Sequence, residues 1–241
     1  MPSFWKHVNR VLKEAEIIII VLDARMIKET RNQEIEEKIR RFGKKILYVF
    51  NKCDLVDKTK LRKTDLQPSV FISSTDRLGT TILKKKILSM SNQNPLLVGI
   101  VGYPNVGKSS LINALSGRGG ARTSSESNYT KGVQKIKVDN RIFLLDTPGV
   151  FPHQEQDQLK HSKTGARDYS KIKDPEFIVL QLVAEEKGII KKHYHIKDDD
   201  PEEIIEAIGR QANMKLSGNR VNLDATSRMI LKDWQTGKIK H

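Results

Sequence analysis

Cysteine is almost absent from this sequence, because Cys53 is the only one among 241 residues. An intrachain disulfide is therefore excluded, and the single thiol favours a reducing compartment. Long apolar runs are also missing: the run Ile17–Leu22 ends at Asp23, whereas a membrane-spanning helix needs about 20 apolar residues. Nothing resembles a signal peptide. We therefore expect a soluble cytoplasmic protein that does not enter a membrane.

Acidic residues are too few to balance the basic ones. The chain has 29 Asp and Glu against 43 Lys and Arg, which gives a formal net charge of +14 and a pI near 9.7. Residues 1–150 hold 27 basic and 14 acidic residues, whereas the remainder holds 16 and 15. The basic excess therefore belongs mostly to the first part of the chain. It favours a polyanionic partner, most simply RNA, over a merely soluble basic surface.

The segment Gly102–Ser109 satisfies the pattern G-x-x-x-x-G-K-[ST], and it lies between an apolar run at 95–101 and a predicted helix at 109–115. Glycines let backbone N–H groups surround phosphate oxygens, and the helix N-terminus adds partial positive charge. Lys108 would reach the β- and γ-phosphates, and the Ser109 hydroxyl would ligate Mg²⁺. The alternative is a chance glycine turn. The other nucleotide-contacting residues that we expect here are Asn105, Val106, Gly107 and Ser110.

A second motif, Asn51-Lys52-Cys53-Asp54, follows a predicted strand at 45–50. Helices are predicted on either side of it, a charged one at about 29–42 and a short basic one at 58–66. The Asp54 carboxylate can accept hydrogen bonds from the N1–H and the exocyclic amine of guanine together, an arrangement that adenine does not offer. Asn51 would contact the base edge, and the stem of Lys52 would lie along the base plane. Alone, these four residues fit an ordinary turn at a strand end equally well. Ser73 and Ser74 end the next predicted strand, at 68–72, where a guanine site often adds a backbone contact.

A third motif, Asp146-Thr147-Pro148-Gly149, follows the second strand of a predicted hairpin-like pair at 133–138 and 142–145. Asp146 would hold Mg²⁺ through its water shell, and the Gly149 N–H would sense the γ-phosphate. The polar stretch 117–130 before it predicts a mobile loop, from which Thr130 would reach Mg²⁺ and the γ-phosphate. The three motifs together predict a GTPase, with catalytic roles for Lys108, Thr130 and Gly149.

These motifs occur in an unusual order, since the guanine motif precedes the phosphate loop and the Asp146 motif comes last. They can still converge on one nucleotide if the chain is a circular permutation. We therefore predict an α/β fold in which a P-loop GTPase domain of permuted motif order, residues 1–160, precedes a small all-helical domain, residues 161–241. The segment at 150–161 would then carry the effect of the γ-phosphate directly into the second domain.

The C-terminal part predicts helices at about 175–186, 201–213 and 224–235, the first two opened by an Asp-Pro pair. His193 and His195 flank Tyr194 at strand spacing and read as surface residues. The three aspartates at 198–200 predict a helix cap rather than a metal site. Six basic side chains could contact RNA phosphates or could belong to an ordinary mixed-charge surface: Lys215, Arg220, Arg228, Lys232, Lys238 and Lys240.

Four stretches resemble the circularly permuted ribosome-assembly GTPases of the YlqF/RbgA type: Val21–Arg25, Asn51–Asp54, Gly102–Leu115 and Phe143–Val150. The resemblance covers most of the chain. It implies a cytosolic GTPase that binds GTP and GDP with Mg²⁺, assists maturation of the large ribosomal subunit, contacts ribosomal RNA and is stimulated by the subunit. We expect a monomer.

Finer points follow the same resemblance. Asn105 matches the asparagine that coordinates K⁺ in potassium-activated relatives, which implies stimulation by K⁺. Val150 stands where many GTPases carry a glutamine that orients water, so slow intrinsic hydrolysis is expected until a partner completes the site. The chain departs from bacterial members by lacking their Pro-Gly-His element. Ser127-Asn128 replaces the usual Pro-Gly before the switch threonine, Thr130.

Two alternatives stand beside this interpretation. The first is a nucleotide-gated switch that binds RNA or protein but does not act on pre-ribosomes. The second is an ATPase, which Asp54 disfavours.

Overall fold

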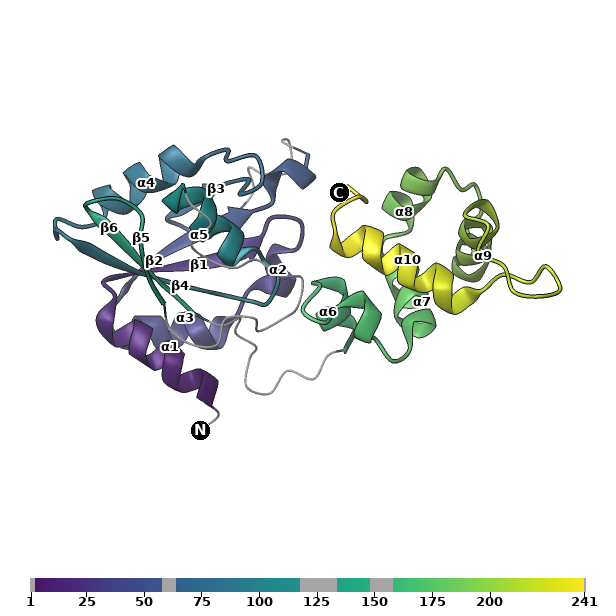
Figure 1. The fold of residues 1–241 in the computed structure, drawn as a ribbon, viewed down its shortest axis with the longest axis horizontal. Coiled ribbons are helices and arrows are strands. Elements are labelled where there is room, and N and C mark those ends of the chain that lie inside the picture. Colours follow the sequence, from purple (N-terminus) through teal and green to yellow (C-terminus); the bar gives the residue numbers. More distant parts are fainter. Residues whose placement is uncertain (1–2, 58–63, 118–133, 148–157, 241) are drawn as a thin grey trace. The chain divides into compact units, whose positions relative to one another are not determined.

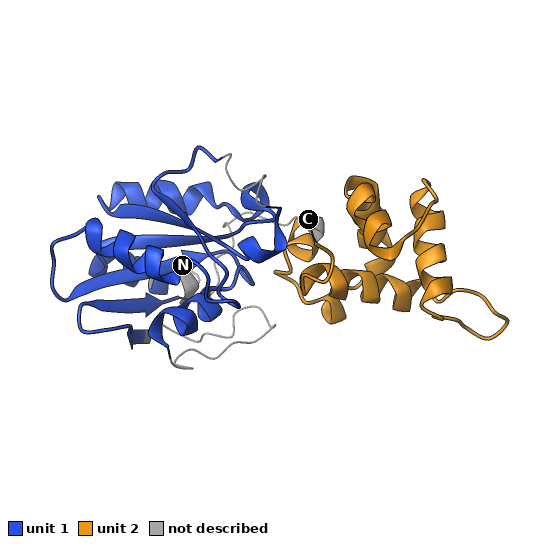
Figure 2. Ribbon diagram, turned by 90° about the horizontal axis from the view of Figure 1, so that it is seen from above, with its two compact units in different colours: residues 1–155 blue, residues 156–241 orange. Residues whose placement is uncertain are grey.

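The computed structural model describes residues 3–57, 64–117, 134–147 and 158–240. The chain forms two compact units, residues 1–155 and residues 156–241, shown in blue and orange in Figure 2. The first unit is a sheet with helices on both faces, and the second is helical (Figure 1). The predicted α/β class with a following helical region is therefore confirmed.

The first unit is built on a six-stranded sheet in the order β3-β2-β1-β4-β6-β5. All neighbouring strands are parallel except β5 and β6, which pair antiparallel as the predicted hairpin requires. Every residue of β1 is buried, in keeping with its continuous apolar run. The strands are β1 (Ile17–Asp23), β2 (Lys45–Asn51), β3 (Ser69–Phe71), β4 (Leu96–Gly102), β5 (Gln134–Lys137) and β6 (Ile142–Asp146).

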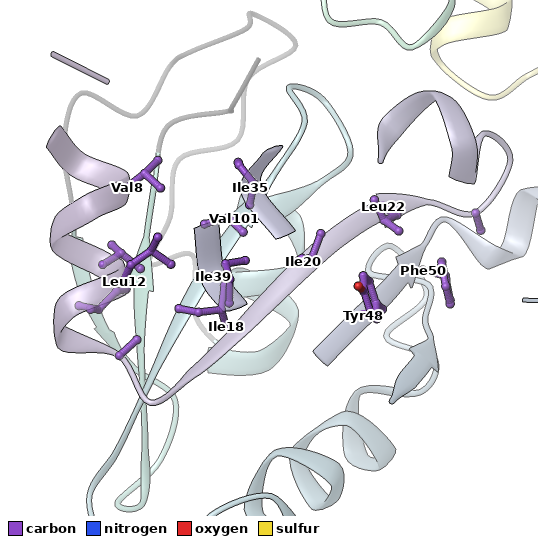
Figure 3. Close-up of a cluster of buried hydrophobic side chains, with 14 of the residues drawn as sticks. Val8, Leu12, Ile18, Ile20, Leu22, Ile35, Ile39, Tyr48, Phe50 and Val101 are labelled. Atoms are coloured by element: carbon purple, nitrogen blue, oxygen red, sulfur yellow. The ribbon is translucent and has the colours of Figure 1, made fainter. Parts of the chain in front are cut away.

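Helices cover both faces of this sheet (Figure 1). On one face, α1 and α3 pack on alternate residues of β1, and the buried cluster in Figure 3 joins Val8 and Leu12 of α1 and Ile35 and Ile39 of α3 with Ile18, Ile20 and Leu22 of the strand. The other face carries α4 and α5. The bounds are α1 (Ser3–Glu14), α2 (Ile27–Thr30), α3 (Gln33–Arg41), α4 (Thr80–Ser89) and α5 (Lys108–Ser116), with a short 3-10 helix η1 (Cys53–Leu55).

The helix expected at 29–42 is divided in two. Asn32 interrupts it, because its backbone is extended and its side chain accepts a hydrogen bond from the Ile35 N–H at 3.2 Å. This is the geometry of an N-cap, so the chain ends α2 and begins α3 there. The basic helix expected at 58–66 falls mostly on 58–63, which lie outside the described residues.

The second unit contains α6 (Gln158–Lys163), η2 (Tyr169–Lys171), α7 (Pro175–Glu185), α8 (Lys187–Tyr194), α9 (Pro201–Gln211) and α10 (Leu223–Gln235). Its centre is Trp234, which is fully buried and whose indole N–H donates to the Lys163 carbonyl at 2.9 Å. The Asp174 and Asp200 side chains cap α7 and α9, so Asp200 is the predicted cap. The strand spacing of the two histidines was misleading, because α8 occupies 187–194.

No helix among the described residues is long and apolar enough to cross a membrane.

Candidate nucleotide-binding site

The predicted motifs meet where the parallel strands end. In the strand register Asn51 lies beside Asp23, Gly102 beside Val21, and Asp146 beside Ile100. The chain leaves β1 toward β2 and β3 on one side, and it continues from β4 toward β6 and β5 on the other. The strand order therefore reverses between β1 and β4. In open α/β sheets, ligands bind at the carboxyl ends of strands at such a switch point.

The phosphate loop closes tightly against the guanine motif at Gly107. This residue has φ +94°, and a Cβ placed there would lie 2.2 Å from Nδ2 of Asn51. Only glycine combines that backbone conformation with so close an approach. Helix α5 begins at the next residue, so its first N–H groups open onto the loop.

Lys108 is the first residue of α5, and its side chain turns back into the loop. The ammonium donates to the carbonyls of Gly102 at 3.0 Å and Tyr103 at 2.9 Å, and the residue is only 8% exposed. Burial lowers the pKa of Lys108 to about 8, although the charge of Asp146 opposes this shift. The loop therefore holds a desolvated ammonium that an added phosphate would stabilise.

Asn51 joins three segments that are far apart in the sequence. Its Nδ2 donates to the Val106 carbonyl at 2.9 Å, and its Oδ1 accepts from the N–H of Ser74 at 3.1 Å and the Ser74 hydroxyl at 2.8 Å. All of these groups are buried. The end of β2, the phosphate loop and the segment after β3 are thus held together, as convergence on one ligand requires.

Lys52 makes a second connection to the phosphate loop. Its backbone is left-handed, with φ +64°, and its ammonium donates to the Asn105 carbonyl at 2.9 Å. The same ammonium lies 2.9 Å from Oδ2 of Asp23. Asp54 follows on the short helix η1 with its side chain exposed, where a ligand can reach it.

The segment after β3 is ordered by its own hydrogen bonds. Ser73 and Leu78 exchange backbone hydrogen bonds, and the Ser73 hydroxyl accepts from the Asp76 N–H at 3.1 Å. Cys53 lies under this turn, where its N–H donates to the Ile72 carbonyl and burial raises the pKa of its thiol. These contacts give Cys53 a structural place in the motif.

The expected Mg²⁺ side of the site is described in part. Asp146 is buried at the end of β6, and the hydroxyl of Thr147 donates to the Ile100 carbonyl at 2.8 Å. Ser109 and Ser110 occupy the first turn of α5 and are half-buried. Two predicted residues, Thr130 and Gly149, lie outside the described residues.

Two residues near the site were not predicted to take part in it. Asp23 and Arg25 form a buried ion pair at the end of β1, next to Lys52. The signal in the sequence that could have pointed to them was Asp23, a charged residue that ends an otherwise apolar buried strand.

The predicted RNA-contacting residues of the second unit differ in their surroundings. Arg228 is engaged by Asp224 and by the carbonyls of Tyr169 and Ser170, and Lys238 pairs with Asp233 at 2.8 Å. Lys215 and Arg220 lie on an exposed turn between α9 and α10, and Lys232 and Lys240 are also exposed.

Comparison with known proteins agrees with this geometry. The sequence profile of the 50S ribosome-binding GTPase family matches residues 97–216. The chain is 39% identical over 247 residues to an uncharacterized GTP-binding protein of Methanocaldococcus jannaschii, covering 98% of this chain and 66% of that protein. It is 31% identical to the nuclear/nucleolar GTPase 2 of Oryza sativa subsp. indica, over 98% of this chain and 47% of that protein.

The chain thus spans about half to two thirds of the length of these relatives. The structure of GDP-bound YlqF is similar in fold, with a TM-score of 0.72 and 20% identity, over 97% of this chain and 96% of that chain.

Proposed function

This chain belongs to the circularly permuted GTPase family of the YlqF/RbgA type, and on that basis we propose that it hydrolyses GTP to GDP and phosphate and assists maturation of the large ribosomal subunit. The observation that carries the proposal is the set of contacts made by Asn51. One side chain ties the guanine motif to the phosphate loop and to Ser74. That arrangement suits a ligand with both a purine base and phosphates.

In the proposed complex, Asp54 accepts from the guanine base while Lys52 and Asn51 fix the edges of the base site. The N–H groups from Gly107 to Ser110 surround the phosphates, and Lys108 moves its ammonium from the loop carbonyls to the phosphate oxygens. Gly149 reports the γ-phosphate through its N–H. The chain's contribution is thus mostly positioning and charge.

The residues on the Mg²⁺ side fit that ion. A hydroxyl from Ser109, a carboxylate from Asp146 and a hydroxyl from Thr130 are oxygen donors of the kind that Mg²⁺ prefers. Asp146 is close enough to Lys108 for its charge to raise the lysine pKa, which supports a place for this carboxylate near the phosphate end of the proposed site. When bound, Mg²⁺ neutralises charge that develops on the phosphates.

Hydrolysis by the chain alone is proposed to be slow, because Val150 cannot orient a water molecule. We propose that K⁺ beside Asn105 and a group from the ribosomal subunit complete the site. Asn105 has a left-handed backbone, with φ +60°, and its carbonyl accepts from Lys52, so its position depends on the guanine motif.

The partner is proposed to be the large subunit, contacted through its RNA by a monomer. The support is the net charge of +14, concentrated in residues 1–150, together with the ribosome-binding family profile. We propose the cytosol as the compartment, on the single cysteine, although the rice relative is named for the nucleus and nucleolus.

GTP turnover in K⁺ and in Na⁺ buffer, with and without purified large subunits, tests this proposal, together with co-sedimentation in GDP and in a non-hydrolysable GTP analogue. We expect turnover to rise with subunits and with K⁺, and binding to the subunit to depend on the nucleotide. Slow turnover in every condition, without co-sedimentation, would leave a nucleotide-gated switch that acts on another RNA or protein.

A further inference from the structure

A buried carboxylate lies between the two halves of the proposed nucleotide site. Asp23 ends β1, and β1 is the strand between β2, which carries the guanine motif, and β4, which carries the phosphate loop. The Asp23 side chain is 1% exposed. Its backbone N–H donates to the Thr30 hydroxyl at 3.1 Å, which itself donates to the Met26 carbonyl at 2.7 Å. These hydrogen bonds fix the backbone that carries the Asp23 carboxylate.

Two cations converge on this carboxylate. Arg25 donates from Nη2 to Oδ2 at 2.7 Å and from Nε to Oδ1 at 3.0 Å, so the guanidinium forms a two-point fork. Lys52 places its ammonium 2.9 Å from Oδ2. Burial alone would favour the neutral acid, but the charges of Lys52 and Arg25 outweigh it and hold the pKa of Asp23 well below its usual range.

The two cations differ in what else they do. The Arg25 side chain is 1% exposed and already balances the charge of Asp23. Lys52 is 22% exposed, and its ammonium also donates to the Asn105 carbonyl in the phosphate loop. A lysine with that exposure has many rotamers available, and holding it in one of them costs conformational entropy. The carboxylate offsets that cost.

We propose that Asp23 is a positioning residue for the base of a bound guanosine di- or triphosphate, acting by holding Lys52 against the phosphate loop. The inference rests on the proposed function, since it assigns a task to Lys52 within that site. Asp23 does not touch the nucleotide. Asp23 holds the Lys52 side chain in place before the nucleotide binds, so less side-chain conformational entropy is lost on binding.

A double-mutant cycle on GDP affinity tests this inference, measured with a fluorescent GDP analogue in Mg²⁺ buffer. Asp23→Asn removes the charge but keeps the size, and Lys52→Met keeps the apolar stem without the ammonium. We expect each single variant to weaken binding about tenfold, and the double variant to bind no worse than Lys52→Met alone. A double variant that binds GDP about 100-fold more weakly than the wild type, the product of two independent tenfold losses, would overturn the inference. An Asp23→Asn variant that binds like the wild type would overturn it as well.

Asp23→Asn leaves a buried guanidinium without its charge partner and can therefore fail to fold. The variant Asp23→Asn/Arg25→Met removes both partners, a change that buried ion pairs often tolerate. It should melt near the wild type in the absence of nucleotide and still bind GDP about tenfold more weakly, and adding Lys52→Met should weaken binding no further. Wild-type affinity in this folded variant would overturn the inference.

Arg25→Met alone is the matched control. It keeps the contact between Asp23 and Lys52, so its GDP affinity should stay close to that of the wild type. If Arg25→Met lost as much GDP affinity as Asp23→Asn, the ion-pair cluster would act through the stability of the fold, which would contradict the inference. If the wild-type protein itself does not bind GDP, the proposed function fails, and that outcome is distinct from every comparison among variants.

Discussion

At the scale of single residues, Lys108 shows most clearly how the fold prepares for an anion. Its ammonium is buried and donates to the Gly102 and Tyr103 carbonyls, and burial lowers its pKa to about 8. A bound phosphate brings negative charge to this ammonium and raises its pKa. Above pH 8, the complex therefore holds more protons than the free protein does, and affinity falls as pH rises.

Calorimetric titration with GDP and Mg²⁺, in buffers of different ionisation enthalpy, measures this linkage. We expect Lys108 to take up almost no proton at pH 7.0 and more than about half a proton at pH 8.5. Lys85→Gln, which neutralises an exposed lysine on α4, should show the same uptake. Binding at pH 8.5 without proton uptake would mean that Lys108 does not meet the phosphates.

At the scale of elements, the chain's patterns predicted the strands better than two of the helical segments, because the helix expected at 29–42 is divided in two and α8 was not expected. An apolar run such as 17–22 has one stable place in an α/β fold, the middle of a covered sheet. The break in the helix at Asn32 was not predicted, because it depends on a single local hydrogen bond to the Asn32 side chain, which the spacing of the residues does not reveal. Helix α8 was missed because Lys187–Tyr194 is too short for its spacing to be distinctive, and packing against α7 and α9 decides its form.

Within the site, too, sequence spacing identified the residues but not the contacts that depend on the folded sheet. The motif residues could be named from their spacing, since phosphate and guanine recognition require those residue types. The contact between Lys52 and Asp23 could not, because Asp23 ends β1 and Lys52 follows β2, and the register of these neighbouring strands is set only in the folded sheet.

Gly99 in β4 shows how closely α1 packs on the strand that carries the phosphate loop. A Cβ placed there would lie 2.4 Å from Cγ1 of Val11 and 2.8 Å from Cδ1 of Ile18. We expect Gly99→Ala to lower the free energy of unfolding by about 1–3 kcal/mol, because α1 must shift. Adding Val11→Ala removes the closer obstacle and should return part of the loss. Urea denaturation of the two variants checks this, and equal losses would contradict the packing described.

At the scale of the whole molecule, the strand order explains how a rotated sequence builds one site. Starting from β4, the chain would run through β5 and β6 and then, with the present ends of this domain joined, through β1, β2 and β3. The motifs would then appear as phosphate loop, Asp146 motif and guanine motif. The rotation leaves each strand's neighbours in the sheet unchanged, so the side chains still meet.

Each unit has its own buried core, so we expect two thermal transitions. GDP with Mg²⁺ at about 100 times its dissociation constant should stabilise the first unit by about 2.7 kcal/mol and raise only its transition, by roughly 5–10 °C. Trp234→Phe should lower only the other transition, by roughly 5–15 °C, because it leaves a small cavity and the Lys163 carbonyl without its indole donor. Calorimetry measures both, and a GDP-induced shift of the transition that Trp234→Phe lowers would contradict the assignment.

The central claim is that this chain recognises guanine, and Asp54 tests it most directly. GDP, ADP and xanthosine diphosphate are titrated against the wild type, Asp54→Asn and the exposed control Asp76→Asn. We predict that the wild type and the control prefer GDP. Asp54→Asn should lose about 100-fold or more in GDP affinity, the worth of two charge-assisted hydrogen bonds, and should gain affinity for xanthosine diphosphate. Equal binding of ADP and GDP by the wild type, or unchanged nucleotide choice in Asp54→Asn, would contradict the account.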